Sequence, residues 1–278
     1  MPVLAALSML CTTTALTSCE HEIDFDYPVS EPKVVIEGRV SNEDTYVRIS
    51  ETRAMNDAAK DHIISDAQVW IADGDGSEEQ LVFDEQTQNY VSPSGRVGTA
   101  GHTYHMSALV DGRRYEATAT MQPQAPVDSV FFRWTEVLNE RIYFLCVKGC
   151  DHLPGQRNYL LLRLWRGNEL FKWNPRSGRS SVNGRFEYDI ICASEKEIEK
   201  GEDDEGKMPL QDGDVITTEV MSIERPCWEY FQSLFYGERT SQNALTNISG
   251  GAQGIFMACS ITRPDTLVFD RATLVEEE

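Results

Sequence analysis

The residues whose spacing most specifically indicates chemistry are Leu16, Thr17, Ser18 and Cys19. A branched apolar residue, two small residues and a cysteine form a lipobox, in which the small side chains let a peptidase close on an extended backbone. The Cys19 thiol would be alkylated with diacylglycerol before cleavage and would become the mature N-terminus. Two acyl chains anchor a protein stably, because each buried methylene contributes about 0.8 kcal/mol. Cys19 is therefore the predicted lipidation site.

Residues 1–18 contain no charged side chain and carry an apolar run, which predicts a signal peptide. The run is shorter than the roughly 20 residues that a spanning helix needs. An ordinary cleaved signal, or a buried N-terminal helix with an incidental cysteine, is the alternative. No Lys or Arg precedes the run, which departs from the usual signal pattern. Residues 19–32 then combine acidic side chains with two prolines, and they predict a lipidated, acidic, extended leash.

Composition limits the classes of partner. The 278-residue chain has 45 acidic and 25 basic residues and a net charge of −20, so it repels phosphate backbones and nucleic-acid binding is not expected. No later apolar run approaches the length of a membrane span. A chain of this length, with 41% hydrophobic residues, can bury one large core or two ordinary ones, and we expect two domains.

Five cysteines remain once Cys11 leaves with the signal peptide and Cys19 is lipidated. They are Cys146, Cys150, Cys192, Cys227 and Cys259. Two disulfides with one free thiol, or buried free thiols, are both compatible with this odd number. The spacing in CVKGCDH, residues 146–152, resembles part of a zinc site, but a second thiolate pair is missing, so no metal and no cofactor are predicted.

Residues 33–122 are predicted to form a sandwich of two antiparallel sheets, because short runs rich in Val, Ile and Tyr alternate with turn residues. The clearest hairpin turns at Asp111 and Gly112. In that register one face is apolar and belongs to the core: Tyr104, Met106, Ala108, Val110, Tyr115, Ala117 and Ala119. The opposite face, with His105, is expected to meet solvent.

The two prolines in residues 121–129 predict a domain boundary. Residues 127–278 are then expected to form a second antiparallel β domain with one short amphipathic helix from Pro226 to Gly237. Its apolar stripe, formed by Trp228, Phe231, Leu234 and Phe235, should pack on the second sheet. The acidic run 194–206 lacks apolar periodicity and is predicted to be a solvated loop, since its spacing does not fit a calcium loop.

A second predicted hairpin turns at Gly167 and Asn168. Its register would place Leu162, Leu164, Phe171 and Trp173 on a buried face. Leu161, Arg163, Trp165, Leu170 and Lys172 would lie on the opposite face. A tryptophan between Arg163 and Lys172 could offer a flat platform to a ligand, so these three are the candidate binding residues. The alternative is that the second domain covers both faces.

No motif predicts catalysis. The chain lacks a G-x-S-x-G elbow, an H-E-x-x-H pair and a phosphate-binding glycine loop, and no catalytic residue is assigned. A pair of carboxylates could still lie close together in space, but their separation is not encoded in spacing alone. The expectation is that the protein is not an enzyme.

Several segments in fixed order resemble a known family: an SC pair followed by acids, KVVIEGRVSN, DAQVWIAD, APVDSVFF and TNISGGAQGIFMACS. They are similar to the Bacteroidota outer-membrane lipoproteins of the DUF4249 domain family. This resemblance covers nearly the whole mature chain. It implies an all-β fold that begins with an immunoglobulin-like or carboxypeptidase-regulatory-like sandwich, and genes beside TonB-dependent transporters. It supplies no catalytic residues.

Two functions from different classes follow. The first is an accessory binding lipoprotein, lipid-anchored at the outer membrane on its outer or periplasmic face, that works with a TonB-dependent transporter in nutrient capture. The second is a structural or adhesive surface protein without a small-molecule ligand. The first predicts a defined patch near Trp165 or between the domains, and the second predicts a flat surface.

We expect mass spectrometry of the native protein to find a mature N-terminus at Cys19 that carries a thioether-linked diacylglycerol. The same preparation of the variant Cys19→Ala should lack that mass and should leave the membrane fraction, whereas Cys150→Ala should keep both. An unmodified Cys19 thiol in native cells would contradict the prediction.

Overall fold

The computed structural model describes residues 31–52, 62–153, 155–178, 183–203, 206–237, 244–274 and 276. These residues are mostly strands, and they include only two α-helices and one short 3₁₀ turn. The predicted all-β fold with a short helix is therefore confirmed. The signal peptide, Cys19 and the leash as far as Ser30 lie outside the described residues. None of the described helices combines the length and the apolar character that crossing a bilayer requires.

The first eight strands follow one another between short turns. They are β1 (Val34–Ser41), β2 (Thr45–Glu51), β3 (His62–Ile63), β4 (Gln68–Asp73), β5 (Glu78–Asp84), β6 (Asn89–Val91), β7 (Thr103–Val110) and β8 (Arg113–Thr120). Their inward side chains form one apolar cluster, to which Phe256 and Ala258 from near the end of the chain also belong. This core therefore combines residues that are distant in sequence.

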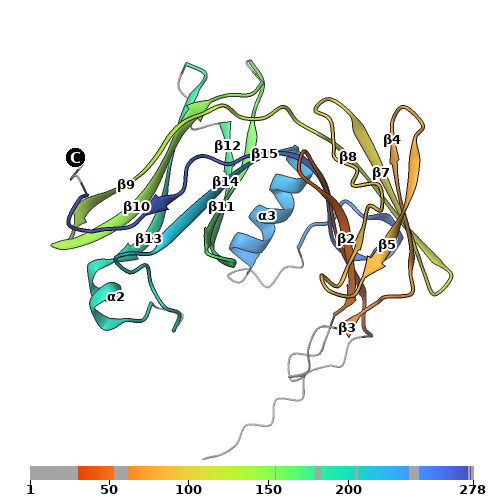
Figure 1. Cartoon of the computed structure of the whole chain (residues 1–278), viewed down its shortest axis with the longest axis horizontal. Coiled ribbons are helices and arrows are strands. Elements are labelled where there is room, and N and C mark those ends of the chain that lie inside the picture. Colours follow the sequence, from red (N-terminus) through yellow and green to blue (C-terminus); the bar gives the residue numbers. More distant parts are fainter. Residues whose placement is uncertain are drawn as a thin grey trace, which may run out of the picture. The chain divides into compact units, whose positions relative to one another are not determined.

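The remaining elements build the rest of the fold. They are β9 (Val127–Val137), β10 (Glu140–Cys150), β11 (Tyr159–Arg166), β12 (Glu169–Ser177), β13 (Arg185–Ser194), α2 (Glu195–Lys200), β14 (Val215–Ile223), α3 (Arg225–Gly237), the 3₁₀ turn Ser249–Gly251, β15 (Gln253–Thr262) and β16 (Leu267–Val268). Strands β13, β10 and β9 pair as a separate sheet (Figure 1). The other strands join in the order β12-β11-β14-β15-β1-β2-β6-β5-β4-β7-β8, with β3 on β2 and β16 on β14.

The predicted hairpin at Asp111 and Gly112 is confirmed. Both residues have positive φ, 47° and 77°, and Val110 pairs with Arg113 across a two-residue turn. Positive φ at both central residues is the geometry of the type I′ turn, which matches the twist of the flanking strands. The predicted apolar face is buried, and His105 on the other face is exposed.

Strand β15 changes partners along its length. Residues 253–259 pair with β1 in parallel, and residues 260–262 pair with β14 in antiparallel fashion. The prediction of purely antiparallel sheets is wrong at β1, because the parallel partner comes from the far end of the chain. Two asparagine amides supply further partners to backbone groups of β15. Asn42 bonds both the N–H and the C=O of Ile261, and Asn247 does the same for Phe256.

The predicted boundary at residues 121–129 falls on a connection rather than on a strand. Residues 121–126 have no regular structure and lie against the end of β15, where Ser260 and Thr262 donate hydrogen bonds to the carbonyls of Gln122 and Ala125. Because β15 pairs both with β1 and with β14, it takes part in hydrogen bonding on both sides of that boundary. The division into 33–122 and 127–278 stays a prediction.

The acidic run 194–206 is not simply a loop, since its first residues form α2. Ser194 accepts a hydrogen bond from the Glu197 N–H, and the Glu197 carboxylate accepts one from the Ser194 N–H. This capping box supplies partners to two backbone donors that a helix start leaves free, and Gly201 ends the helix in the left-handed conformation. The S-x-x-E spacing was the signal that the apolar-periodicity argument overlooked.

The predicted short amphipathic helix is confirmed as α3. Its Cys227 and Tyr230 join a cluster with Leu161, Met221 and residues of β15, and Trp228 and Phe231 pack against this cluster. Trp228 lies 5.3 Å from Tyr159 between ring centroids. The helix therefore covers the face of β11 and β14 that is turned away from the β13-β10-β9 sheet.

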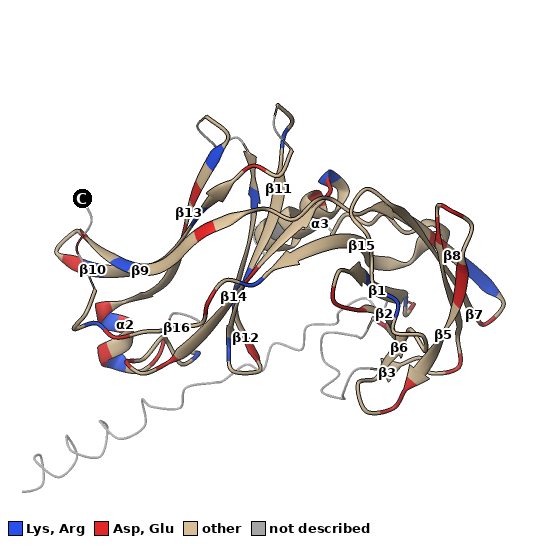
Figure 2. Cartoon of the chain, turned by 45° about the horizontal axis from the view of Figure 1, so that its top comes forward, with Lys and Arg blue, Asp and Glu red and all other residues tan. Residues whose placement is uncertain are grey.

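Charged side chains are spread over the whole described part of the chain. Figure 2 shows Asp and Glu (red) on strands, helices and loops, with Lys and Arg (blue) interspersed among them. Most of the described ion pairs have at least one exposed side chain, and exposed pairs contribute little, about 0–1 kcal/mol each. The fold therefore depends on its apolar clusters and on backbone pairing, and the surface acids mainly set the net charge.

Replacing Gly254 by Ala should destabilise the protein by about 3 kcal/mol. Gly254 has φ 97°, and an added Cβ would lie 2.1 Å from the Ile36 carbonyl oxygen, so the β1–β15 pairing would have to open. Gly76 has nearly the same φ, 93°, but open space around it. Gly76→Ala should therefore cost only about 1 kcal/mol, the backbone cost alone. Urea unfolding measures the loss of stability in both variants. Equal losses would contradict a role for the close approach between residue 254 and Ile36.

Candidate functional site

The β11–β12 hairpin turns at Gly167 and Asn168 as predicted, but its register is not the predicted one. Leu164 pairs with Lys172 whereas Trp165 pairs with Leu170, so a β-bulge adds one residue to β12. One extra residue moves every later side chain to the other face. Trp173 consequently lies opposite Arg163 and not on the face of Leu162 and Leu164.

The bulge turns polar residues of β12 toward the inside of the sandwich. Leu160, Leu162 and Leu164 are buried between the two sheets, and their partners on β12 are Arg176, Asn174 and Lys172, respectively. The β12 strand is the last in its sheet, so the apolar core ends here. Pro175 in β12 fits this edge position, because a proline lacks the N–H that a central strand needs.

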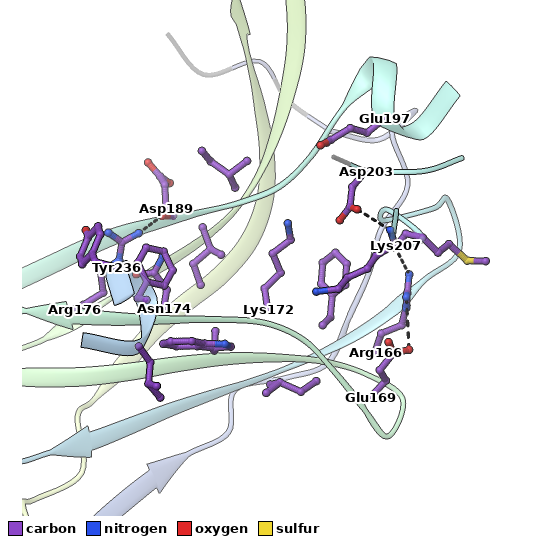
Figure 3. Close-up of a pocket in the computed structure, with 18 residues that line it drawn as sticks. Arg166, Glu169, Lys172, Asn174, Arg176, Asp189, Glu197, Asp203, Lys207 and Tyr236 are labelled. Carbon is purple, nitrogen blue, oxygen red and sulfur yellow. Dashed lines mark hydrogen bonds and ion pairs between the residues drawn. The ribbon is translucent and has the colours of Figure 1, made fainter. Parts of the chain in front are cut away.

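A groove of about 710 Å³ follows this edge of β12. Its walls come from β12, from residues 189–191 of β13, from the segment between α2 and β14, and from the end of α3 (Figure 3). The volume is in the range of small-molecule sites. Several large apolar side chains in the groove are exposed, by 39–63%: Leu170, Ile191, Met208, Leu234, Phe235 and Tyr236.

Each carboxylate in the groove already has a partner. Asp189 receives two hydrogen bonds from Arg133, at 3.2 and 2.6 Å. Glu197 belongs to the capping box of α2, and Asp203 accepts the N–H of Lys207. Glu169 lies 3.7 Å from an Arg166 nitrogen. These carboxylates are therefore engaged in holding the walls.

By contrast, the cations Lys172 and Arg176 have no charged partner at ion-pair distance within the described residues. Lys172 Nζ lies 5.5 Å from the Phe171 ring centroid, and no carboxylate of the described residues lies within ion-pair distance of it. Figure 3 shows its side chain pointing into the groove. Arg176 donates to the backbone carbonyl of Asp189, and its Nε, which is buried, has no hydrogen-bond partner among the described residues. Burial lowers the pKa of the Arg176 guanidinium.

Trp165 lines a separate, smaller hollow of about 320 Å³ together with Asn168, Thr217 and Arg263. The Arg163 guanidinium lies 5.2 Å from the Trp165 ring centroid, so the predicted contact between cation and ring is present. Lys172 is absent from this hollow, because the bulge turns it to the opposite face. The structure therefore brings Trp165 and Arg163 together and separates Lys172 from them. A binding role for each stays a prediction.

Beside Trp165, a buried carboxylate joins two arginines. Glu219 is 4% exposed, and its oxygens lie 2.6 Å from Arg163 and 2.5 Å from Arg263. Arg263 also pairs with Glu43 at 2.7 Å. Burial alone would raise the pKa of Glu219, but Arg163, the Trp165 indole and Arg263 together hold that pKa below its ordinary value. An ionised carboxylate, held in place by two arginines, therefore lines the Trp165 hollow.

Sequence reasoning missed the residues that the long-range pairing brings to the groove. Leu234 and Phe235 were assigned to a core stripe of α3, but they are 39% and 41% exposed and line the groove. Arg176 was not singled out at all. The alternation of Lys172, Asn174 and Arg176 was a signal in the sequence, but only a known bulge assigns these three to the inner face.

The cysteines and His152 lie apart from the groove lining. All five cysteines of the described residues are free, and Cys146 and Cys150 donate toward different acids, Glu187 and Asp128. Burial lowers the pKa of His152 to about 4, so this imidazole is neutral at pH 7. Within the described ranges, no three His, Cys, Asp or Glu side chains are placed to hold a metal ion.

Comparison with known proteins places the chain in a family. The model of the family described as a domain of unknown function, DUF4249, matches residues 20–264, which is most of the chain, so the protein belongs to this family. A search of curated proteins finds no match. The family description carries no activity, and any function must be argued from the geometry.

The variant Glu219→Gln should lose about 3 kcal/mol of stability at pH 7, because it leaves two arginines without their buried counter-charge. The lowered pKa of Glu219 stabilises the wild type above the unfolded-state pKa of this carboxyl, and that share is lost as the pH falls through the lowered value. The free energy of unfolding of the variant, measured with urea, should therefore fall less than that of the wild type between pH 7 and pH 3.

Glu43→Gln is the matched control, because Glu43 contacts the same Arg263 from an exposed position. It should cost less than about 1 kcal/mol. Equal losses for the two variants, or an unchanged acid dependence in Glu219→Gln, would contradict the assignment of Glu219 as the central ion.

Proposed function

We propose that this protein is a non-enzymatic accessory binding lipoprotein, held at the outer membrane by acyl chains on Cys19 and acting with a TonB-dependent transporter in nutrient capture. The observation that carries the binding role is the groove of about 710 Å³ along β12, with exposed aromatic side chains and Lys172 pointing into it. A structural or adhesive protein has no need of such a concave site.

The lining favours binding over catalysis. The groove residues include no Ser, Cys or His among those that the structure describes, and its carboxylates are engaged with Arg133, Arg166 or backbone N–H groups. Acid–base and nucleophilic catalysis need such a group free and within reach of a substrate. The exposed rings and the Lys172 cation, beside carboxylates that already have partners, are suited to holding a ligand.

The membrane part of the proposal is supported by the lipobox, and the transporter part by the resemblance to family members encoded beside transporters. Membership of the family is consistent with both and tests neither. The high negative charge of the chain is compatible with an exported protein and disfavours nucleic-acid partners.

Affinity purification from detergent-solubilised outer membranes tests the proposal. The tagged wild type should recover a TonB-dependent transporter, and Cys19→Ala should recover at least tenfold less, because it is no longer concentrated at the membrane. Cys150→Ala, which alters another thiol, should behave as the wild type. Recovery of no transporter by the wild type would overturn the partnership, and equal recovery by Cys19→Ala would overturn the role of the anchor.

A further inference from the structure

The inner-face positions of β12 are unusual for a sandwich core. Along β11 the inner side chains are Leu160, Leu162 and Leu164, each 0–2% exposed. One strand further out, the same face carries a lysine, an asparagine and an arginine. Placing a cation at the rim of an apolar core costs free energy unless the charge is matched.

Within the described part of the chain, neither cation forms an ion pair with a carboxylate. Lys172 has no carboxylate within ion-pair distance, and Arg176 donates only to a backbone carbonyl while its guanidinium lies 5.6 Å from the Tyr188 ring centroid. In a chain with a net charge of −20, carboxylates are abundant, yet those that line the groove have other partners. Lys172 thus offers hydrogen-bond donors to an anion from outside, whereas Arg176 lies four residues further along β12 and is already bound to the Asp189 carbonyl.

The rest of the groove is suited to an apolar body. Trp173 packs against Phe235 with ring centroids 5.5 Å apart, and Phe235 is itself 41% exposed. Leu170 and Ile191 add further exposed apolar surface in the same groove. Exposed apolar side chains gathered in one concave site mark a place where a ligand is desolvated.

We propose that the groove binds a small amphiphilic carboxylate, with its anionic group at Lys172 and its apolar chain or ring against Phe235 and the other exposed apolar side chains of the groove. This inference deepens the proposed binding function and rests on it. The groove volume admits one molecule of this class, and both an alkyl and an aromatic acid present the required chemistry.

A different explanation for inward-pointing charges is that they protect an edge strand from pairing with another chain. That role needs no ligand. It predicts that loss of the Lys172 charge increases self-association and leaves the binding of small acids unchanged. The two explanations therefore differ in a direct binding experiment.

Isothermal titration calorimetry of the purified full-length chain should use octanoate and 2-naphthoate as probes, with octanamide and 2-naphthamide as uncharged controls of similar shape. We expect at least one acid to bind, and its amide to bind at least tenfold more weakly. Binding should also weaken as the salt concentration rises, because an ion pair at a partly exposed groove is screened. The better acid distinguishes an alkyl ligand from an aromatic one.

The variant Lys172→Met keeps the length of the side chain and removes its charge. It should lower the affinity for the acid about tenfold, with the amide unaffected. Lys200→Met removes a lysine from the exposed end of α2 and is the matched control, which should bind as the wild type. Unchanged melting temperatures establish that both variants fold. Equal binding of acid and amide, no binding of either acid, or an unchanged affinity in Lys172→Met would overturn the inference.

The outcome is separable from that of the proposed function. Recovery of a transporter through Cys19 with no binding of the acids would retain the lipoprotein role and reject this ligand class. Lys172-dependent binding of an acid, together with an unmodified Cys19 in native cells and no transporter recovered by the wild type, would retain the ligand class and reject the membrane role.

Discussion

Strand β15 must satisfy its backbone groups on two edges while it passes from one partner to another. Each polar backbone group left unpaired in the interior costs about 1–3 kcal/mol. The amides of Asn42 and Asn247 have a donor and an acceptor in the spacing of a peptide unit, and each bonds both backbone groups of one β15 residue. These amides therefore supply partners to the backbone groups of Ile261 and Phe256, in a strand that exchanges β1 for β14 along its length. The order of all the strands from β12 to β8 depends on this exchange.

The groove lies at the end of this strand order. Because β15 pairs with β14, and β14 with β11, strand β12 becomes the terminal strand and its outer edge faces the rim of the β13-β10-β9 sheet. The two sheets are joined where Arg176 donates to the Asp189 carbonyl and the Tyr188 hydroxyl donates to the Ser177 carbonyl, and the space beyond is the groove. A sandwich that closed at this side would need apolar side chains on β12. The bulge places polar ones there and keeps it open.

Local structure was largely predictable, because alternation and turn residues act over a few positions. The turn at Asp111 and Gly112 needs only two residues of positive φ, and the strands of both halves follow from their own side chains. Pairing between β1 and β15 was not predictable, since Asn42 and Ile261 are 219 residues apart and no local sequence pattern indicates that they are in contact. The bulge in β12 was equally hidden. It reversed the face of Lys172 and thereby separated this residue from Trp165 and Arg163, the other two predicted binding residues.

The contrast between the two hollows shows what distinguishes a structural ion cluster from a site open to a ligand. Beside Trp165, the cations Arg163 and Arg263 are matched by Glu219, so the charges there already hold β11, β14 and the end of β15 together. In the groove the relation is reversed, because the acids are matched by groups of the walls whereas Lys172 lacks a carboxylate among the described residues. An aromatic ring next to a cation occurs in both places. The unmatched charge, rather than the ring, is what singles out the groove, and sequence spacing alone does not reveal which charges are matched.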